Sequence, residues 1–153
     1  MDLKIPHHAF VLVGDGRKAI FFRNEGDAVF PNLKTSEVFV DENPPSHEQG
    51  TERPGRISKG SRTGGRSAVE PTDWHLLEEQ HFVRTVAAAM ERLVRVSKVK
   101  KLVVVAPPRT LAELRVAFHP DVKACIVAEV NKDLTKHPVG EIERYLTGGI
   151  ISQ

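Results

Sequence analysis

Cysteine and long apolar runs are the scarcest features of this sequence. One cysteine among 153 residues excludes an intramolecular disulfide framework and a zinc site built from several cysteines. The longest apolar runs, such as 9–13 and 102–106, are five residues long, whereas a membrane-spanning helix needs about 20. The N-terminus has no apolar stretch of signal-peptide length. We therefore expect a reduced, soluble, cytoplasmic protein with no membrane partner.

The length and composition fit one globular domain covering residues 1–153. Hydrophobic residues make up 40% of the chain and charged residues 27%, which is an ordinary globular composition. The net charge of +2 is unevenly distributed, because residues 53–66 contain five cations and no acidic residue. The setting of that basic stretch therefore decides what the charge means for function.

The apolar pattern predicts an α/β fold. Short runs rich in β-formers predict strands at residues 9–13, 19–24, 33–40, 102–106 and 124–130. Helical spacing predicts helices at residues 72–97, 110–118 and 139–146, with a capping box at Thr110–Glu113 and Pro138 at the first position of the last helix. This order indicates a single domain with a mixed five-stranded sheet, an antiparallel N-terminal meander and an α-β-α-β-α second half.

Residues 41–72 form a long segment rich in glycine, proline and arginine, with no helical or strand period. Loops of this length inside a compact domain are usually functional or disordered. Glycines such as Gly64 and Gly65 let a backbone approach a ligand closely, and arginines beside them can contact phosphate. The predicted RNA-binding cations are Arg53, Arg56, Lys59, Arg62 and Arg66. A solvated loop that carries charge for solubility is the alternative.

Two further places could bind anions. Basic residues from Arg92 to Lys101 follow the end of the long helix, although cations there also complement the helix dipole. Arg109 and Thr110 lie between a central strand and the start of a helix, which is where open α/β sheets commonly bind anions. The alternative for Arg109 is an exposed side chain in a tight turn.

The sequence gives little support for a metal site or for a catalytic nucleophile. Asp15, Asp73, Glu129 and Asp133 invite comparison with metal-dependent nucleases, but no pair has a diagnostic spacing. No two histidines are four residues apart, as the helix of a zinc protease requires. Cys125 lies in an apolar strand and is expected to be buried. We expect no metal and no small-molecule cofactor.

The motif Gly64-Gly65-Arg66-Ser67-Ala68, followed by a long amphipathic helix and a strand, resembles the middle domain of archaeal and eukaryotic class-one peptide-chain release factors. That resemblance implies an RNase-H-like fold and a GGQ-type loop that acts on peptidyl-tRNA. Here Arg66 replaces the glutamine, and a guanidinium cannot accept a hydrogen bond from water. Gly64, Gly65 and Arg66 are therefore candidate catalytic residues whose chemistry is unknown.

Over about residues 8–147 the chain also resembles a bacterial family named for attachment to host cells, which is related to release-factor-like domains. The stretches that carry this match are ENPP at 42–45, EQGT at 48–51, RPGR at 53–56, DWH at 73–75, APPRTL at 106–111 and NKDLT at 131–135.

Three functions follow from these observations. The first is a cytoplasmic, release-factor-like module that associates with RNA, directed to the ribosome or to tRNA. The second is a regulatory factor without enzymatic activity that binds a protein partner and is needed for attachment to host cells. The third is a peptidyl-tRNA esterase that uses Gly64, Gly65 and Arg66.

Overall fold

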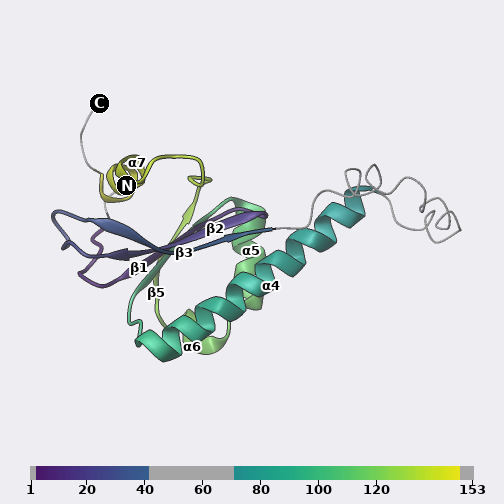
Figure 1. Cartoon of the computed structure of the whole chain (residues 1–153), viewed down its shortest axis with the longest axis horizontal. Coiled ribbons are helices and arrows are strands. Elements are labelled where there is room, and N and C mark those ends of the chain that lie inside the picture. The colour runs from purple at the N-terminus through teal and green to yellow at the C-terminus, as the bar shows by residue number, and fades with distance from the viewer. Residues whose placement is uncertain (1–2, 42–70, 149–153) are drawn as a thin grey trace, which may run out of the picture.

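The described part of the chain is a five-stranded sheet with helices on both faces (Figure 1). A computed structural model describes residues 3–41 and 71–148, with the backbone alone at 71–75. The elements are β1 (Phe10–Gly14), β2 (Lys18–Asn24), β3 (Leu33–Val40), α4 (Pro71–Ser97), β4 (Leu102–Ala106), α5 (Pro108–Ala117), α6 (Pro120–Lys123), β5 (Ile126–Asn131) and α7 (Val139–Thr147).

The sheet has the strand order β3-β2-β1-β4-β5. Strands β1, β2 and β3 form an antiparallel meander, while β4 pairs in parallel with both β1 and β5. The predicted mixed α/β sheet is therefore confirmed, including the position of its antiparallel half. At the edge, β3 carries an irregularity where Phe21 pairs with Glu37 and Phe22 pairs with Thr35.

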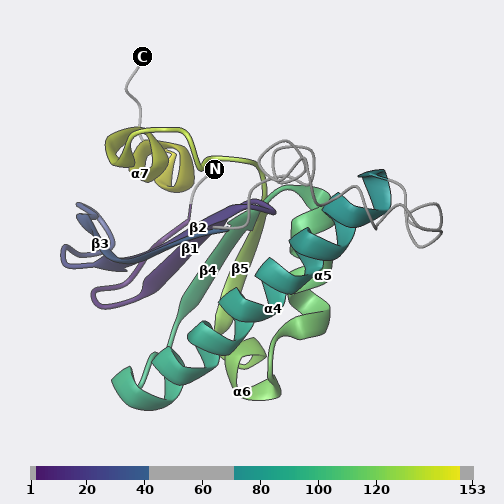
Figure 2. The ribbon, with the colours of Figure 1, turned by 45° about the vertical axis from the view of Figure 1, so that its right-hand side comes forward.

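The central strands are buried on both faces, as their continuous apolar sequences predict. All five residues of β1 and all five of β4 are buried. Leu12, Phe21 and Val104 face α4, α5 and α6, where they pack against Met90 and its neighbours. Val13, Val103 and Val105 belong to the opposite face, where Ile142 and Leu146 of α7 cover the sheet (Figure 2).

The boundaries of the second half differ from the sequence prediction in several details. Strand β5 begins at Ile126 rather than at residue 124, so Cys125 lies just before this strand and not in it. The capping box at Thr110 is wrong, because α5 begins at Pro108 and Thr110 lies inside its first turn. Pro138 is the N-cap of α7 rather than its first residue. Helix α4 begins at Pro71, which was expected just outside it. The single-turn helix α6 is absent from the sequence prediction, in which the second helix ends at residue 118 and a strand begins at residue 124.

Candidate functional site

The direction of the strands defines two edges of the sheet. Strands β1, β4 and β5 run parallel to one another, so they all begin at the same edge. We call the edge where they begin, at Phe10, Leu102 and Ile126, the amino edge, and the opposite edge the carboxyl edge. Helix α4 runs the other way, so its last residue, Ser97, lies near the amino edge (Figure 2).

At the amino edge, the turn before β1 is held by Asn24. The side chain of Asn24 is fully buried. Its amide nitrogen donates to the backbone oxygen of Ile5 at 2.7 Å, and its amide oxygen accepts from the backbone N–H groups of Gly26 and Asn32 at 2.9 and 2.8 Å. The backbone oxygen of Asn24 also accepts from the N–H of His8 at 2.7 Å. One buried amide thus fixes both the turn that carries the two histidines and the turn after β2.

The two histidines of this turn stack on each other. The ring centroids of His7 and His8 lie 3.7 Å apart. His7 Nδ1 lies 2.7 Å from the backbone oxygen of Gly26, and because a carbonyl only accepts, Nδ1 carries the proton. Desolvation and the charge of Arg23 lower the pKa of His8 below its ordinary value. The two rings therefore form one aromatic surface at the amino edge, and the lowered pKa of His8 favours its neutral form.

The second wall of this edge is the link between α4 and β4. Lys98 ends the helix with φ of 55°, in the left-handed region where glycine is usual at this position. A side chain there costs about 1–2 kcal/mol. His8 has φ of 71°. Within the described residues, these are the two non-glycine residues with positive φ, and both face the same hollow.

That hollow is a cavity of about 600 Å³, which we call the amino-edge pocket. Its floor includes Phe10, Leu93 and Val99. Its polar lining includes His7, His8, Arg23, Lys98, Lys100 and Lys101, together with the hydroxyls of Ser36 and Ser97. Among the described residues that line it, none is acidic.

The charges of the amino-edge pocket are mostly uncompensated. Lys98, Lys100 and Lys101 form no ion pair with any carboxylate in the described ranges. Arg23 is the exception, since its Nη1 lies 3.0 Å from Glu25 Oε2, and exposed pairs of this kind are weak. The pocket therefore concentrates positive charge over an apolar floor.

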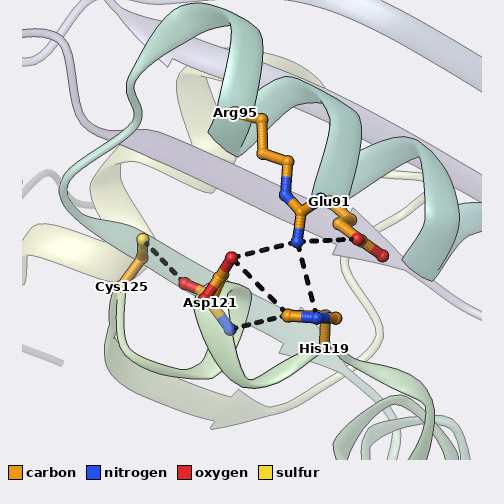
Figure 3. A network of polar contacts seen from close by, with 5 residues as sticks. All are labelled: Glu91, Arg95, His119, Asp121 and Cys125. Atoms are coloured by element: carbon orange, nitrogen blue, oxygen red, sulfur yellow. Dashed lines mark hydrogen bonds and ion pairs between the residues drawn. The ribbon is translucent and has the colours of Figure 1, made fainter.

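Arg95 does not contribute to this positive charge, although it belongs to the same basic stretch of sequence. Its Nη2 atom lies 3.0 Å from Glu91 Oε2 and 3.0 Å from Asp121 Oδ2 (Figure 3). His119 Nδ1 accepts from the N–H of Asp121 at 3.0 Å and thereby caps α6. The network joins α4 to α6. Within the predicted basic cluster from Arg92 to Lys101, Arg95 therefore holds two helices together, whereas Lys98, Lys100 and Lys101 line the pocket.

At the carboxyl edge, the predicted anion-site residues have acidic neighbours. Arg109 Nη1 lies 3.4 Å from Glu79 Oε1 of α4, and Thr110 is buried. Glu113, one turn after Arg109, has an Oε1 atom that is buried without a hydrogen-bond partner within the described structure. Burial and the charge of Glu79 raise the pKa of Glu113. Anion binding at Arg109 and Thr110 stays a prediction.

The acidic residues considered for a nuclease site separate into two groups. Asp15 accepts from the N–H groups of Arg17 and Lys18, as expected for the turn between β1 and β2. The hydroxyl of Thr135 lies 3.1 Å from Asp15 Oδ2 and 2.7 Å from Asp133 Oδ1, so it brings these two together. Glu129 instead pairs with Arg115. The described residues contain no group of three or more histidine, cysteine, aspartate or glutamate side chains able to hold a metal.

The residues predicted to contact RNA or to act in catalysis lie outside the described residues, and so do the side chains of Asp73 and Trp74. These predicted residues are Arg53, Arg56, Lys59, Arg62, Gly64, Gly65 and Arg66. Sequence reasoning missed Asn24, Arg23, His7 and His8, because nothing in the sequence places residues 7–8 beside residues 98–101.

A family model described as "Protein required for attachment to host cells" matches residues 10–146. The chain belongs to this family. The match runs from the first residue of β1 into the last turn of α7, so residues 6–9 of the amino-edge pocket precede it. No curated protein matches the chain. Among the helices in the described ranges, none has the length and apolar character needed to cross a membrane.

Proposed function

We propose that this member of the host-attachment family is a module that associates with RNA, and that the amino edge is one of its RNA-binding surfaces. The observation that carries the proposal is the set of Lys98, Lys100 and Lys101 around one pocket with no acidic lining residue. RNA backbones are bound chiefly by cations that replace condensed counterions.

The contrast between the two edges supports this choice of surface. At the carboxyl edge Arg109 pairs with Glu79, and the same edge carries Glu113 and the two aspartates, Asp15 and Asp133, that Thr135 joins. A polyanion approaching there meets several carboxylates. At the amino edge it meets lysines that no carboxylate neutralises, so electrostatic attraction favours the amino edge.

In this proposal the protein is a release-factor-like, cytoplasmic module that is directed to the ribosome or to tRNA. A mixed sheet with an antiparallel meander and a long helix before β4 is consistent with the RNase-H-like fold that this resemblance implies. The predicted basic segment precedes the other end of α4, whose 27 residues span about 40 Å. RNA contacts at both ends of α4 would therefore be far apart along one rod. The esterase alternative depends on Gly64, Gly65 and Arg66 alone.

The direct test is binding of a fluorescein-labelled single-stranded RNA and of ribosomes at low and high salt. The variant Lys98→Ala/Lys100→Ala/Lys101→Ala is compared with Lys132→Ala/Lys136→Ala/Arg144→Ala, which removes the same charge from the region of β5 and α7. We expect salt-sensitive binding that only the first variant loses. Equal binding by both variants would show that the amino edge is not the RNA surface.

The second candidate function is a non-enzymatic regulatory factor that binds a protein partner and is needed for attachment to host cells. The family match favours it. Complementing a deletion strain with each triple variant separates the two candidates. Loss of attachment with the amino-edge variant alone, at equal protein level, would link attachment to the RNA surface, whereas full attachment with it would favour a protein partner.

A further inference from the structure

The amino-edge pocket has more structure than a basic surface patch. It combines a cavity of about 600 Å³, an apolar floor, a stacked imidazole pair and three unpaired lysines. A cavity of this volume lies in the range of small-molecule and cofactor sites. Contact with a continuous RNA backbone requires cations along a surface, but it does not require a hollow of this volume.

We propose that the amino-edge pocket binds the terminal phosphate and the adjoining base of a 5′-nucleotide. This inference rests on the proposed RNA association only for the source of the ligand, which is either the 5′ end of an RNA or a free mononucleotide. Both sources present the same chemistry, a phosphate monoester attached to a nucleoside.

The lysines select for a terminal rather than an internal phosphate. A monoester carries close to two negative charges at neutral pH and three free oxygens, whereas an internal diester carries one charge. Lys98, Lys100 and Lys101 line the cavity from the link between α4 and β4, and Arg23 lines it from β2. Ser36 and Ser97 add hydroxyl donors to the same lining. Several donors around one cavity match a compact dianion.

The rest of the lining suits a base. Histidine rings are among the side chains on which RNA-binding proteins stack unpaired bases. His7 and His8 are already stacked on each other, with an angle of 32° between their planes. Leu93, Val99 and Phe10 supply apolar surface beside them. Charge and aromatic surface therefore line the same cavity.

The backbone conformation of the pocket also supports a ligand site. His8 and Lys98 both adopt positive φ values that side chains rarely adopt. Strained residues of this kind cluster at ligand sites. Glycine would satisfy the backbone at Lys98 without strain, and yet lysine occupies this position in the pocket lining.

The positive φ of Lys98 allows a substitution that tests the role of its charge without damaging the fold. Lys98→Gly removes one cation and relieves a left-handed conformation, so the variant should fold at least as well as the parent protein. Lys136→Gly is the matched control, because Lys136 is an exposed lysine that does not line the pocket. Thermal unfolding of both variants checks that the fold is intact.

The experiment follows backbone amide signals by NMR during titration with adenosine 5′-monophosphate, adenosine and inorganic phosphate. We expect the monophosphate to shift the signals of His8 and of residues 97–101, and adenosine to bind at least 10-fold more weakly. Lys98→Gly should weaken the monophosphate at least 5-fold, while Lys136→Gly should not. Absence of these shifts, or equal affinity in Lys98→Gly, would overturn the proposal.

A second pair of probes identifies the source. One RNA oligonucleotide is prepared with a 5′-phosphate and with a 5′-hydroxyl. Tighter binding of the phosphorylated form supports an RNA end, and tighter binding of the free mononucleotide supports a small ligand. Mononucleotide binding without RNA binding would retain the pocket and reject the RNA module. RNA binding that ignores the 5′-phosphate, without mononucleotide binding, would retain the module and reject the pocket.

Discussion

The amide nitrogen of Asn24, at the end of β2, donates a 2.7 Å hydrogen bond to the backbone oxygen of Ile5. Those two residues are 19 positions apart, and both are fully buried. The bond ties the chain before β1 to the turn after β2, and so it holds His7 and His8 at the rim of the amino-edge pocket. The side-chain amide of Asn24, buried and hydrogen-bonded at both its nitrogen and its oxygen, therefore stabilises the fold and also positions the histidines of the candidate site.

Replacing Asn24 with alanine should therefore destabilise the protein. The change leaves the partly buried N–H groups of Gly26 and Asn32 and the buried oxygen of Ile5 without their partner, which should cost about 2 kcal/mol. The melting temperature should fall by about 4–8 °C. Calorimetry or thermal circular dichroism measures this fall.

Asn32→Ala is the control for that experiment. The Asn32 side chain is exposed, and its backbone N–H still donates to Asn24. Removing the Asn32 side chain should change the free energy of unfolding by less than about 0.5 kcal/mol. Equal effects of the two substitutions would contradict the role assigned to the buried amide.

Glu113→Gln should stabilise the protein at neutral pH. Burial and Glu79 raise the pKa of Glu113 in the folded state, so ionising it costs the fold free energy. The protonated carboxyl contributes its full share to the free energy of unfolding below pH 4.5, the pKa of this group in the unfolded chain. That share is lost as the pH rises through the higher pKa of the folded state. Glutamine keeps the neutral form at every pH.

We expect Glu113→Gln to raise the melting temperature by about 1–2 °C at pH 7 and to have no such advantage near pH 4. Glu78→Gln, which removes the same charge from α4, is the comparison. A gain that is equal at both pH values, or equal in both variants, would be inconsistent with a buried carboxylate at position 113.

The thiol of Cys125 should be unreactive in the folded protein. Burial is the main cause of its raised pKa, and the charge of Asp121 adds to it. The thiol lies 3.4 Å from the backbone oxygen of Asp121 (Figure 3) and 3.3 Å from that of Val99, and its one proton can serve either acceptor. Alkylation by iodoacetamide at pH 7 should be about 100-fold slower than for free cysteine. Rapid labelling without denaturant would show that the α6 region opens.

The sequence predicted the sheet well because its signals are local. Continuous apolar runs identify β1 and β4, and the Asp15-Gly16 turn identifies the β1–β2 hairpin. The ends of helices were less certain, because capping depends on backbone angles. At Thr110 the prolines before it start α5 earlier than its capping box implied.

The candidate pocket could not be predicted for a different reason. It brings together residues 6–10, 23, 36, 93 and 97–101, which meet only when β1, β2, β3 and α4 are assembled. Lys98 carried a signal of its own as a cation after a helix end, but helix-dipole stabilisation explains that position equally well. The separation of Arg95 from the lysines depends on Asp121, 26 residues away in α6.

The central claim is that uncompensated lysines at the amino edge contact RNA phosphates. Its most direct test is the salt dependence of single-stranded RNA affinity, since each phosphate contact contributes a slope of about −0.7 in log K against log salt concentration. In Lys98→Ala/Lys100→Ala/Lys101→Ala the account predicts weaker binding and a slope shallower by about 2. An unchanged slope in that variant would contradict the account.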